Sequence, residues 1–373
     1  MKKCKLLYFI SEDEYFLTHK LSQALEAKKN NFEVSVVTKF SNFNKKIKSY
    51  GFKTYELNFD RKSLNFFSNL LSLFFFLKII FKEKPDIIQS IALKPILYTS
   101  LISKLFTKTN FIFCVVGLGY LFLSKSNLNK IIKFIFFTLL KVFISKKNSL
   151  FIFQNEDDLN FFLKNSILKN IRYKIISGSG VDNKKFIQKN TKKVYDLILH
   201  SRLLIHKGIY ELINALKDLK NKGLNIKLLI LGNPDPHNLA SIKYREIMEW
   251  QSQGLIIWKK RVTNVLPYLQ KSRISILPSY REGLPKSLLE AASCGLPLIA
   301  TDVPGCREIC IENYNGLLVP ARSSSHLSAA IERIVYDYKI QKKFGKNSIR
   351  LVKKNFSDEI ISKEFLKLYK SLI

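Results

Sequence analysis

The stretch Ile274-Ser-Ile-Leu-Pro-Ser-Tyr-Arg-Glu-Gly-Leu-Pro-Lys-Ser-Leu-Leu-Glu290 leads from a short apolar run into a helical pattern, through a loop that contains glycine and proline. The run 274–277 predicts a strand, and Pro285 suits the first position of the following helix, where a missing N–H costs nothing. Glu282 lies in the loop, and we expect Glu290 about two turns into the helix. A strand that passes directly into a helix is typical of an α/β domain with a parallel sheet.

The start of this predicted helix is a candidate binding site. We expect the backbone N–H groups from Gly283 to Ser287 to be free at the positive end of the helix, which attracts a phosphate or a sugar oxygen. Glu282 and Glu290 flank that end, and carboxylates accept hydrogen bonds from hydroxyl groups. The arrangement favours a ligand that carries both hydroxyls and phosphate, such as a nucleotide-sugar.

Short apolar runs alternate with longer helical patterns along the 373-residue chain, which predicts an α/β fold of doubly wound parallel sheets. The pattern restarts near Val194, after the polar stretch 182–193. We therefore predict two Rossmann-like domains, 1–182 and 183–355, that face a central cleft, where the carboxyl ends of their strands bind ligands. A C-terminal helix within 356–373 is expected to pack back toward the first domain.

Individual elements follow from the same pattern. Strands are predicted near residues 5–10, 33–38, 53–57, 86–89, 111–116, 150–153, 173–176, 194–200, 226–231, 255–258, 274–277, 297–300 and 317–319. In the first domain, helices are predicted near residues 15–29, 64–82, 95–106, 128–146 and 156–165. Two helical segments, near 324–338 and 357–372, are expected to close the chain.

The composition is that of a folded, strongly basic protein, with 62 Lys and Arg against 29 Asp and Glu and a formal net charge of +33. Two explanations of the charge stay open. An AT-rich genome would encode many lysines, which would then occupy solvent-exposed surface. Alternatively, the protein binds an anionic partner such as a membrane leaflet or a polyphosphate. Few, scattered cysteines, no visible secretory signal and no apolar run of roughly 20 residues predict a cytoplasmic protein without disulfides or a metal site.

One predicted helix, near 128–146, is amphipathic. Lys130, Lys133 and Lys141 share part of one face, and apolar side chains cover most of the rest. This favours a helix that lies on the anionic cytoplasmic surface of a membrane, although a buried helix with a lysine edge would look much the same. We expect the phenylalanine-rich run 66–81 to belong to the core. Nucleic acid is not an expected partner, because no motif of a known reader is present.

A second candidate stretch, Ser201-Arg-Leu-Leu-Ile-His-Lys-Gly208, follows the first strand of the second domain and opens a helix. Arg202 and Lys207 flank the turn, and two fixed cations beside a helix start suit a diphosphate leaving group. An ordinary basic loop is the alternative. The presence of Glu282 and Glu290 farther along the same domain favours the functional interpretation.

The combination resembles the family 4 glycosyltransferases, which are retaining, nucleotide-sugar-dependent enzymes with the GT-B fold of two Rossmann-like domains. The densest similarity lies in residues 277–286, 289–292, 295–297, 301–308 and 315–320. The resemblance implies that Glu282 binds the donor sugar, that Glu290 holds the ribose hydroxyls, and that Arg202 and Lys207 neutralise the departing diphosphate. The amides of Gly283 and Leu284 would contact sugar or phosphate, and neither a metal nor another cofactor would be needed.

Motifs of the first domain are similar to one branch of this family. They lie in residues 59–65, 86–90, 116–120, 153–157 and 178–182. The branch includes bacterial enzymes that add N-acetylgalactosamine to undecaprenyl-diphosphate-linked glycans, and related transferases for O-antigen and capsule. The similarity implies a UDP-sugar donor, an N-acetylhexosamine in particular, and a lipid-linked saccharide acceptor.

Other positions depart from the family pattern. Ser11-Glu-Asp-Glu14 stands where many members carry a glycine pair near the donor phosphates. Val116-Gly-Leu-Gly119 replaces a frequent histidine, and Gly117 and Gly119 would let the backbone approach the sugar closely. His19 matches a histidine of this branch near the acceptor, but a helix-start histidine that merely caps or packs is an equal alternative.

Two further histidines belong to the second domain. We expect His200, at the end of a strand, to be structural, and His206 to be exposed to solvent rather than catalytic.

Three alternative functions remain open. The first is a nucleotide-sugar epimerase or phosphorylase on the same fold, and the second is a non-catalytic membrane-binding or polyanion-binding subunit. The third is nucleic-acid binding driven by charge alone.

Overall fold

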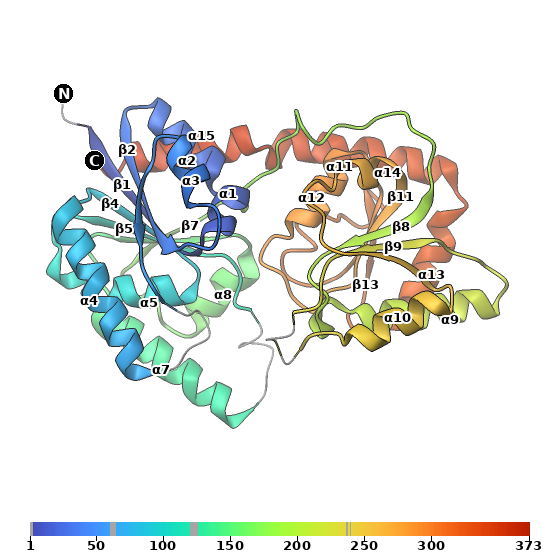
Figure 1. The fold of residues 1–373 in the computed structure, drawn as a ribbon, viewed down its shortest axis with the longest axis horizontal. Helices are drawn as coiled ribbons and strands as arrows, with labels where there is room; N and C mark the ends of the chain where they lie inside the picture. Colours follow the sequence, from blue (N-terminus) through green and yellow to red (C-terminus); the bar gives the residue numbers. More distant parts are fainter. Residues whose placement is uncertain (1–2, 60–64, 120–125, 236–237, 239) are drawn as a thin grey trace. The chain divides into compact units, whose positions relative to one another are not determined.

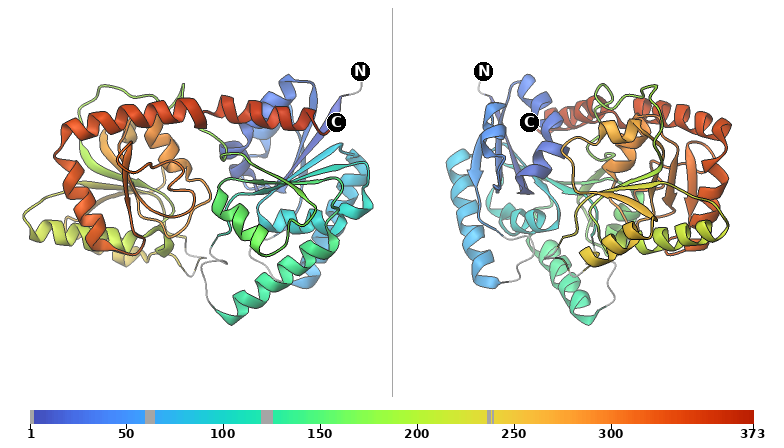
Figure 2. Two further views of the ribbon diagram at one scale, coloured as in Figure 1. Left: turned by 180° about the vertical axis from the view of Figure 1, so that it is seen from behind. Right: turned by 45° about the vertical axis from the view of Figure 1, so that its right-hand side comes forward.

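The computed structural model describes residues 3–59, 65–119, 126–235, 238 and 240–373. The chain divides into two compact units, one formed by Met1–Ser179 with Asp358–Ile373 and the other by Gly180–Ser357. Each unit contains a parallel sheet with helices on both of its faces, as the ribbon shows in Figure 1 and, from two further sides, in Figure 2. The predicted α/β fold class is therefore confirmed.

The sheet of the first unit has seven strands in the order β3-β2-β1-β4-β5-β6-β7, and all neighbouring pairs are parallel. The strands are β1 (Cys4–Glu12), β2 (Phe32–Lys39), β3 (Lys53–Glu56), β4 (Ile87–Ile91), β5 (Asn110–Val115), β6 (Ser149–Phe153) and β7 (Arg172–Ile175). In β1, Leu7 and Phe9 pack into one apolar cluster, whereas Leu6 and Tyr8 pack into the cluster on the opposite face. The central strand is therefore buried on both sides, as expected of a parallel sheet.

Two sets of helices cover this sheet. The helices are α1 (Asp13–His19), α2 (Leu21–Lys29), α3 (Asn44–Ser49), α4 (Phe66–Glu83), α5 (Leu93–Ile102), η1 (Ser103–Leu105), α7 (Asn127–Phe143), α8 (Glu156–Lys164) and α15 (Asp358–Lys370). Helices α4, α5, α7 and α8 share one apolar cluster, and α1, α2, α3 and α15 share the other. The end of the chain is held through Tyr369, whose hydroxyl lies 2.9 Å from the hydroxyl of Tyr8.

The junction after β1 differs from the expectation. The single helix predicted over 15–29 is two helices, which meet at Lys20, where φ is −126°. Residues 11–14 form no open loop, because β1 continues to Glu12 and α1 begins at Asp13. The buried carboxylate of Asp13 accepts hydrogen bonds from the backbone N–H groups of Ser41 at 2.8 Å and Phe43 at 3.0 Å. Asp13 thus fixes a neighbouring loop.

The sheet of the second unit has six parallel strands in the order β10-β9-β8-β11-β12-β13. The strands are β8 (Tyr195–His200), β9 (Leu228–Leu231), β10 (Ile256–Lys259), β11 (Ser272–Leu277), β12 (Leu298–Thr301) and β13 (Gly316–Val319). The helical elements are η2 (Ile205–Lys207), α9 (Ile209–Asn221), α10 (Tyr244–Ser252), α11 (Leu266–Gln270), α12 (Lys286–Ser293), α13 (Ser324–Val335), α14 (Tyr338–Leu351) and the π turn η3 (Val352–Phe356). Strand order changes direction around β8 and β11, whose carboxyl ends carry the two candidate loops.

Helix α14 was not predicted from the sequence. Its residues are mostly polar, and its buried positions include Gly345 and Ser348 rather than a row of large apolar side chains. Gly345 packs so closely on Gly295 that a Cβ atom there would collide with the Gly295 carbonyl oxygen. Phe344 is the large apolar side chain among these buried positions, so the mostly polar sequence offers few apolar residues from which to predict the helix.

Helix α4 is also less buried than expected. Phe76 and Ile80 belong to the core, but Phe67 is 80% exposed and Leu71 and Phe74 are more than half exposed. The expectation that the run 66–81 is core is therefore wrong for much of the helix. Within the described ranges, no helix combines the length and the apolar character needed to cross a bilayer.

Candidate active site

Three loops meet at the carboxyl ends of β8, β11 and β12 in the second unit. The backbone N–H of Tyr280 donates to the His206 carbonyl at 2.9 Å, and the backbone N–H of Glu282 donates to the Pro304 carbonyl at 3.2 Å. Gly208 has a left-handed φ of +71°, and a Cβ atom there would collide with the carbonyl oxygen of Pro278. The loop after β8 is therefore fixed against the loop after β11 by backbone contacts.

These contacts bring the side chains of Lys207 and Glu282 together. Lys207 Nζ lies 2.5 Å from Glu282 Oε1, and the two side chains are only 14% and 13% exposed. An ammonium group has three N–H donors and a carboxylate has two acceptor oxygens. The pair therefore retains donors on Lys207 and the second oxygen of Glu282 for a ligand.

His206 reports the charges around this pair. The pKa of His206 is lowered to about 4, and burial is the largest cause; the charges of Lys207 and Arg202 also lower it, whereas that of Glu282 raises it. His206 is therefore neutral near pH 7. The expectation that it is exposed to solvent is wrong, because the turn of η2 half-buries its ring. Arg202 itself is exposed, but it lies close enough to share this electrostatic environment.

Glu290 lies on α12, which begins later than predicted. Pro285 is the residue before the helix, with φ −71° and ψ 110°, and the first helical residue is Lys286. Glu290 therefore lies little more than one turn into the helix, not two, since a turn has 3.6 residues. Its Oε2 atom lies 3.2 Å from Nε2 of His200, the last residue of β8.

Sequence reasoning treated His200 as structural and missed this contact with a predicted ligand-binding residue. In the sequence, the one feature that could have indicated this contact was the position of His200 in the chain. His200 ends the first strand of the second unit and stands two residues before Arg202.

Residues 283–285 form the tight turn into α12. Gly283 is close to Gly305, where a Cβ atom would collide with the Gly283 carbonyl oxygen. Leu284 packs against the apolar cluster under the loop, and Pro285 is buried. No side chain of the described residues caps the start of α12. The glycine at 305 is thus what allows the loop after β12 to support the Glu282 loop.

Gly117, Gly119 and His19 belong to the first unit, whereas Glu282, Glu290, Arg202 and Lys207 belong to the second. Gly117 and Gly119 follow β5 and have φ of +108° and +67°. A Cβ atom at 119 would meet no described atom within 4 Å, so the backbone conformation, not close packing, requires a glycine there.

His19 ends α1 in the first unit. Its ring stacks on Tyr15, with centroids 4.0 Å apart and planes 2° apart, and its Nδ1 atom lies 2.7 Å from Thr18 Oγ1. These contacts orient the ring.

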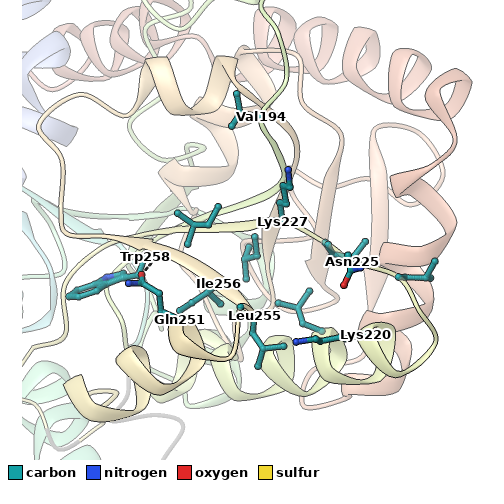
Figure 3. A pocket seen from close by; sticks show the side chains of 14 residues that line it. Val194, Lys220, Asn225, Lys227, Gln251, Leu255, Ile256 and Trp258 are labelled. Atoms are coloured by element: carbon teal, nitrogen blue, oxygen red, sulfur yellow. Dashed lines mark hydrogen bonds between the residues drawn. The ribbon is translucent and has the colours of Figure 1, made fainter.

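A hollow of about 720 Å³ lies in the second unit near the amino ends of β8, β9 and β10, away from the carboxyl ends that carry the candidate loops (Figure 3). Its lining includes Val194, just before β8, and Leu228 and Ile256, the first residues of β9 and β10. Of its polar side chains, Lys220 donates to the Gln253 carbonyl at 2.9 Å and Gln251 accepts from the Trp258 backbone at 3.0 Å. None of the predicted site residues lines this hollow, so it is separate from the Lys207–Glu282 pair.

Comparison with known proteins identifies the family to which the chain is similar. Residues 181–351 match the family model described as Glycosyl transferases group 1, and residues 5–155 match the model Glycosyl transferase 4-like. The chain is 28% identical over 374 residues to N,N'-diacetylbacillosaminyl-diphospho-undecaprenol alpha-1,3-N-acetylgalactosaminyltransferase of Campylobacter jejuni, covering 96% of each chain. It is 24% identical over 291 residues to UDP-Gal:alpha-D-GlcNAc-diphosphoundecaprenol alpha-1,3-galactosyltransferase of Escherichia coli, covering 74% of this chain and 73% of the relative.

Solved structures show the same fold at low sequence identity. Sucrose-phosphate synthase from Thermosynechococcus elongatus superposes with a TM-score of 0.82 and 18% identity, covering 99% of both chains. Anabaena HepE, solved in complex with UDP, superposes with a TM-score of 0.77 and 15% identity, covering 98% of this chain and 100% of that one. The chain therefore belongs to the glycosyltransferases of GT-B fold, with a Glycosyl transferase 4-like first unit and a second unit of the Glycosyl transferases group 1 family.

Proposed function

We propose that this enzyme transfers an N-acetylhexosamine from a UDP-sugar to an undecaprenyl-diphosphate-linked saccharide, with retention of the α-anomer. The observation that carries the proposal is the contact between Lys207 and Glu282 at the carboxyl ends of β8 and β11. The pair brings together a cation, which can bind phosphate, and a carboxylate, which can accept hydrogen bonds from sugar hydroxyls. The names of the Campylobacter and Escherichia relatives both specify a diphospho-undecaprenol acceptor and an α-1,3 linkage, which supports this acceptor class.

In this proposal each residue of the second unit binds a different part of the donor. Glu282 accepts hydrogen bonds from hydroxyls of the transferred sugar, and the amides of Gly283 and Leu284 contact sugar or phosphate. Glu290 accepts hydrogen bonds from the ribose hydroxyls. Lys207 and Arg202 bind the diphosphate, and Lys207 can do so with the N–H donors that Glu282 leaves free.

In this proposal the anomeric configuration is retained because the acceptor attacks the anomeric carbon from the same face as the leaving group. The acceptor hydroxyl oxygen forms a bond to the anomeric carbon while the bond from that carbon to the UDP oxygen breaks. The hydroxyl proton passes to an oxygen of the departing β-phosphate, and Lys207 and Arg202 stabilise the negative charge that develops there. Stabilisation of developing charge by preorganised groups is commonly the largest catalytic contribution.

The two cationic side chains take the place of a metal ion in this scheme. The reaction is therefore expected to proceed at full rate after the enzyme and substrates have been treated with EDTA. Loss of activity that added Mg²⁺ or Mn²⁺ restores would overturn this part of the proposal.

The acceptor lipid implies a membrane surface, and helices α4 and α7 of the first unit are the proposed contact. Each carries large apolar side chains that are more than half exposed, including Phe67, Leu71 and Phe74 on α4 and Leu128, Ile131 and Phe134 on α7. The carboxylate in these two helices is Glu83, which is buried and bonded to Ser35 Oγ at 3.0 Å.

Lysines accompany the apolar side chains of both helices. Lys78 lies over the ring of Phe74 at 4.5 Å, and Lys130 and Lys141 are exposed on α7. A surface of apolar side chains and lysines without exposed carboxylates is suited to bind an anionic membrane leaflet. We therefore propose that the protein associates peripherally with the inner face of the plasma membrane.

The test is a transfer assay with the full-length protein, a panel of UDP- and GDP-sugars, and an undecaprenyl-diphosphate-linked saccharide. We expect a lipid-linked product from a UDP-N-acetylhexosamine. A UDP-sugar that is consumed or isomerised without a lipid-linked product would favour an epimerase instead. Failure to bind any nucleotide-sugar would favour a non-catalytic subunit.

A further inference from the structure

The contact between His200 and Glu290 connects the end of β8 to helix α12. The Nε2–Oε2 distance is 3.2 Å, and the side chains are 9% and 15% exposed. The two residues are 90 positions apart in the chain. Since a carboxylate only accepts hydrogen bonds, the Nε2 atom of His200 must carry the proton and donate it to Glu290.

The alternation of β8 explains why a histidine at this position faces α12. Leu197 and Leu199 belong to the apolar cluster that includes α9 and α13, whereas Ile198 belongs to the cluster that includes α12. Side chains two residues apart in a strand share a face. His200 therefore lies on the α12 side with Ile198, at the position where the strand ends.

The other ring nitrogen of His200 does not anchor the ring. Nδ1 is buried and has no hydrogen-bond partner among the described residues. A buried polar atom without a partner destabilises a fold. The hydrogen bond to Glu290 is therefore the polar interaction that orients the imidazole. An apolar residue could pack at this position without leaving a buried nitrogen unpaired.

We propose that His200 is a positioning residue for the donor nucleotide, and this rests on the proposed role of Glu290 in binding the ribose. By donating to Oε2, His200 fixes the rotation of the Glu290 carboxylate and directs Oε1 toward the ribose hydroxyls. A carboxylate held in its binding orientation before the ligand arrives loses less conformational freedom on binding. His200 thus acts on donor affinity without touching the reacting atoms.

The experiment measures UDP binding to the full-length protein by titration calorimetry. His200→Leu keeps a side chain of similar size and removes the donor, whereas His200→Gln keeps an N–H donor. We expect His200→Leu to weaken UDP binding about tenfold, as the loss of one hydrogen bond to a charged group does. His200→Gln should stay within about threefold of wild type. Ile198→Val, one step back on the same face, is the matched packing control and should bind UDP as wild type does.

Three further readouts separate positioning from a general effect on folding. In a double-mutant cycle, His200→Leu should have no effect on UDP affinity once Glu290→Ala is present, because its partner is gone. Steady-state kinetics should show a raised KM for the donor in His200→Leu with kcat unchanged. The preference for UDP over 2′-deoxy-UDP should also fall in this variant.

The outcomes distinguish the two proposals. If wild type binds UDP and His200→Leu binds it equally well, the role of His200 is wrong while the proposed function stands. Equal losses in His200→Leu with and without Glu290→Ala, or a loss in Ile198→Val as large as in His200→Leu, would also overturn it. If wild type binds no UDP at all, the proposed function fails first.

Discussion

Lys207 Nζ lies 2.5 Å from Glu282 Oε1, although the two residues are 75 positions apart in the chain. Each extends from a loop at the carboxyl end of a different strand, β8 for Lys207 and β11 for Glu282. Backbone contacts between Gly208 and Pro278 and between Tyr280 and His206 set this approach. The ion pair is thus built into the loops rather than formed by two flexible side chains that meet at the surface.

Replacing Lys207 should damage catalysis more than donor recognition. We expect Lys207→Ala to lower kcat by a factor of about 10² to 10³, because the positive charge that stabilises the leaving diphosphate is lost. The measurement is the steady-state transfer rate over a range of donor concentrations. Lys222→Ala is the matched control, since it removes a lysine whose ion pair with Glu332 is 55% and 43% exposed. Equal rates for Lys207→Ala and Lys222→Ala would remove Lys207 from the mechanism.

Glu282 should also act mainly on turnover. We expect Glu282→Ala to raise the barrier by roughly 2–4 kcal/mol, because the transferring sugar loses an orienting hydrogen bond and Lys207 loses its partner. Single-turnover kinetics at saturating donor measure this directly. A variant with an unchanged single-turnover rate would show that Glu282 does not orient the sugar.

Glu290 should show the opposite pattern. We expect Glu290→Ala to weaken UDP binding by about tenfold while kcat falls much less, since its proposed ligand, the ribose, stays bound unchanged through the reaction. Calorimetric titration with UDP and steady-state kinetics give the two quantities. A large fall in kcat with normal UDP affinity would contradict the division of roles between Glu282 and Glu290.

His206 should make the stability of the second unit depend on pH. Its pKa is about 4 in the folded protein and about 6.5 when unfolded, so the unfolded state binds more protons between these values. The stabilisation is fully present above pH 6.5 and is lost as the pH falls through about 4. Wild type should therefore lose free energy of unfolding relative to His206→Gln as the pH is lowered from 7 to 5.

Urea unfolding of both proteins at several pH values measures this difference. Tryptophan fluorescence reports on the second unit, because the two tryptophans, Trp250 and Trp258, both lie there. Parallel stability curves for wild type and His206→Gln would show that the pKa of His206 is not depressed.

Membrane binding should depend on the lysines of α7. Replacing Lys130, Lys133 and Lys141 together with glutamine should weaken binding to anionic vesicles by about 3 kcal/mol, at about 1 kcal/mol for each charge near the surface. Vesicle sedimentation measures the bound fraction. The control replaces three lysines of α14, Lys339, Lys342 and Lys343, which changes net charge equally in the other unit. Similar losses in both variants would indicate a nonspecific effect of charge.

Much of the fold could be predicted because parallel strands are short, apolar and separated by helical patterns. Every strand of the two sheets lies close to its predicted position, including the outermost ones. The two loops that carry Lys207 and Glu282 could be recognised as a pair, because both follow strands and open helices. Sequence alone does not give their contact, which depends on the glycine at 208 and the backbone of Pro278.

The predictions that were wrong have identifiable physical causes. Pro285 precedes α12 instead of starting it, since its ψ of 110° is extended. Helix α14 is mostly polar and buries a glycine and a serine beside Phe344, so few of its buried positions are apolar in the sequence. The sequence of α4 is apolar all round, so it does not reveal that Phe67 and Phe74 are exposed. The contact of His200 with Glu290 could not be predicted, because the two residues are 90 positions apart in the chain.

The most direct test of the central claim is the transfer assay with wild type and Lys207→Ala, with the anomeric configuration of the product read by NMR. We predict that wild type forms an α-linked, lipid-bound product from a UDP-sugar, and that Lys207→Ala, still folded and still able to bind UDP, forms it at least about 10²-fold more slowly. A β-linked product, or wild-type turnover in Lys207→Ala, would contradict the account.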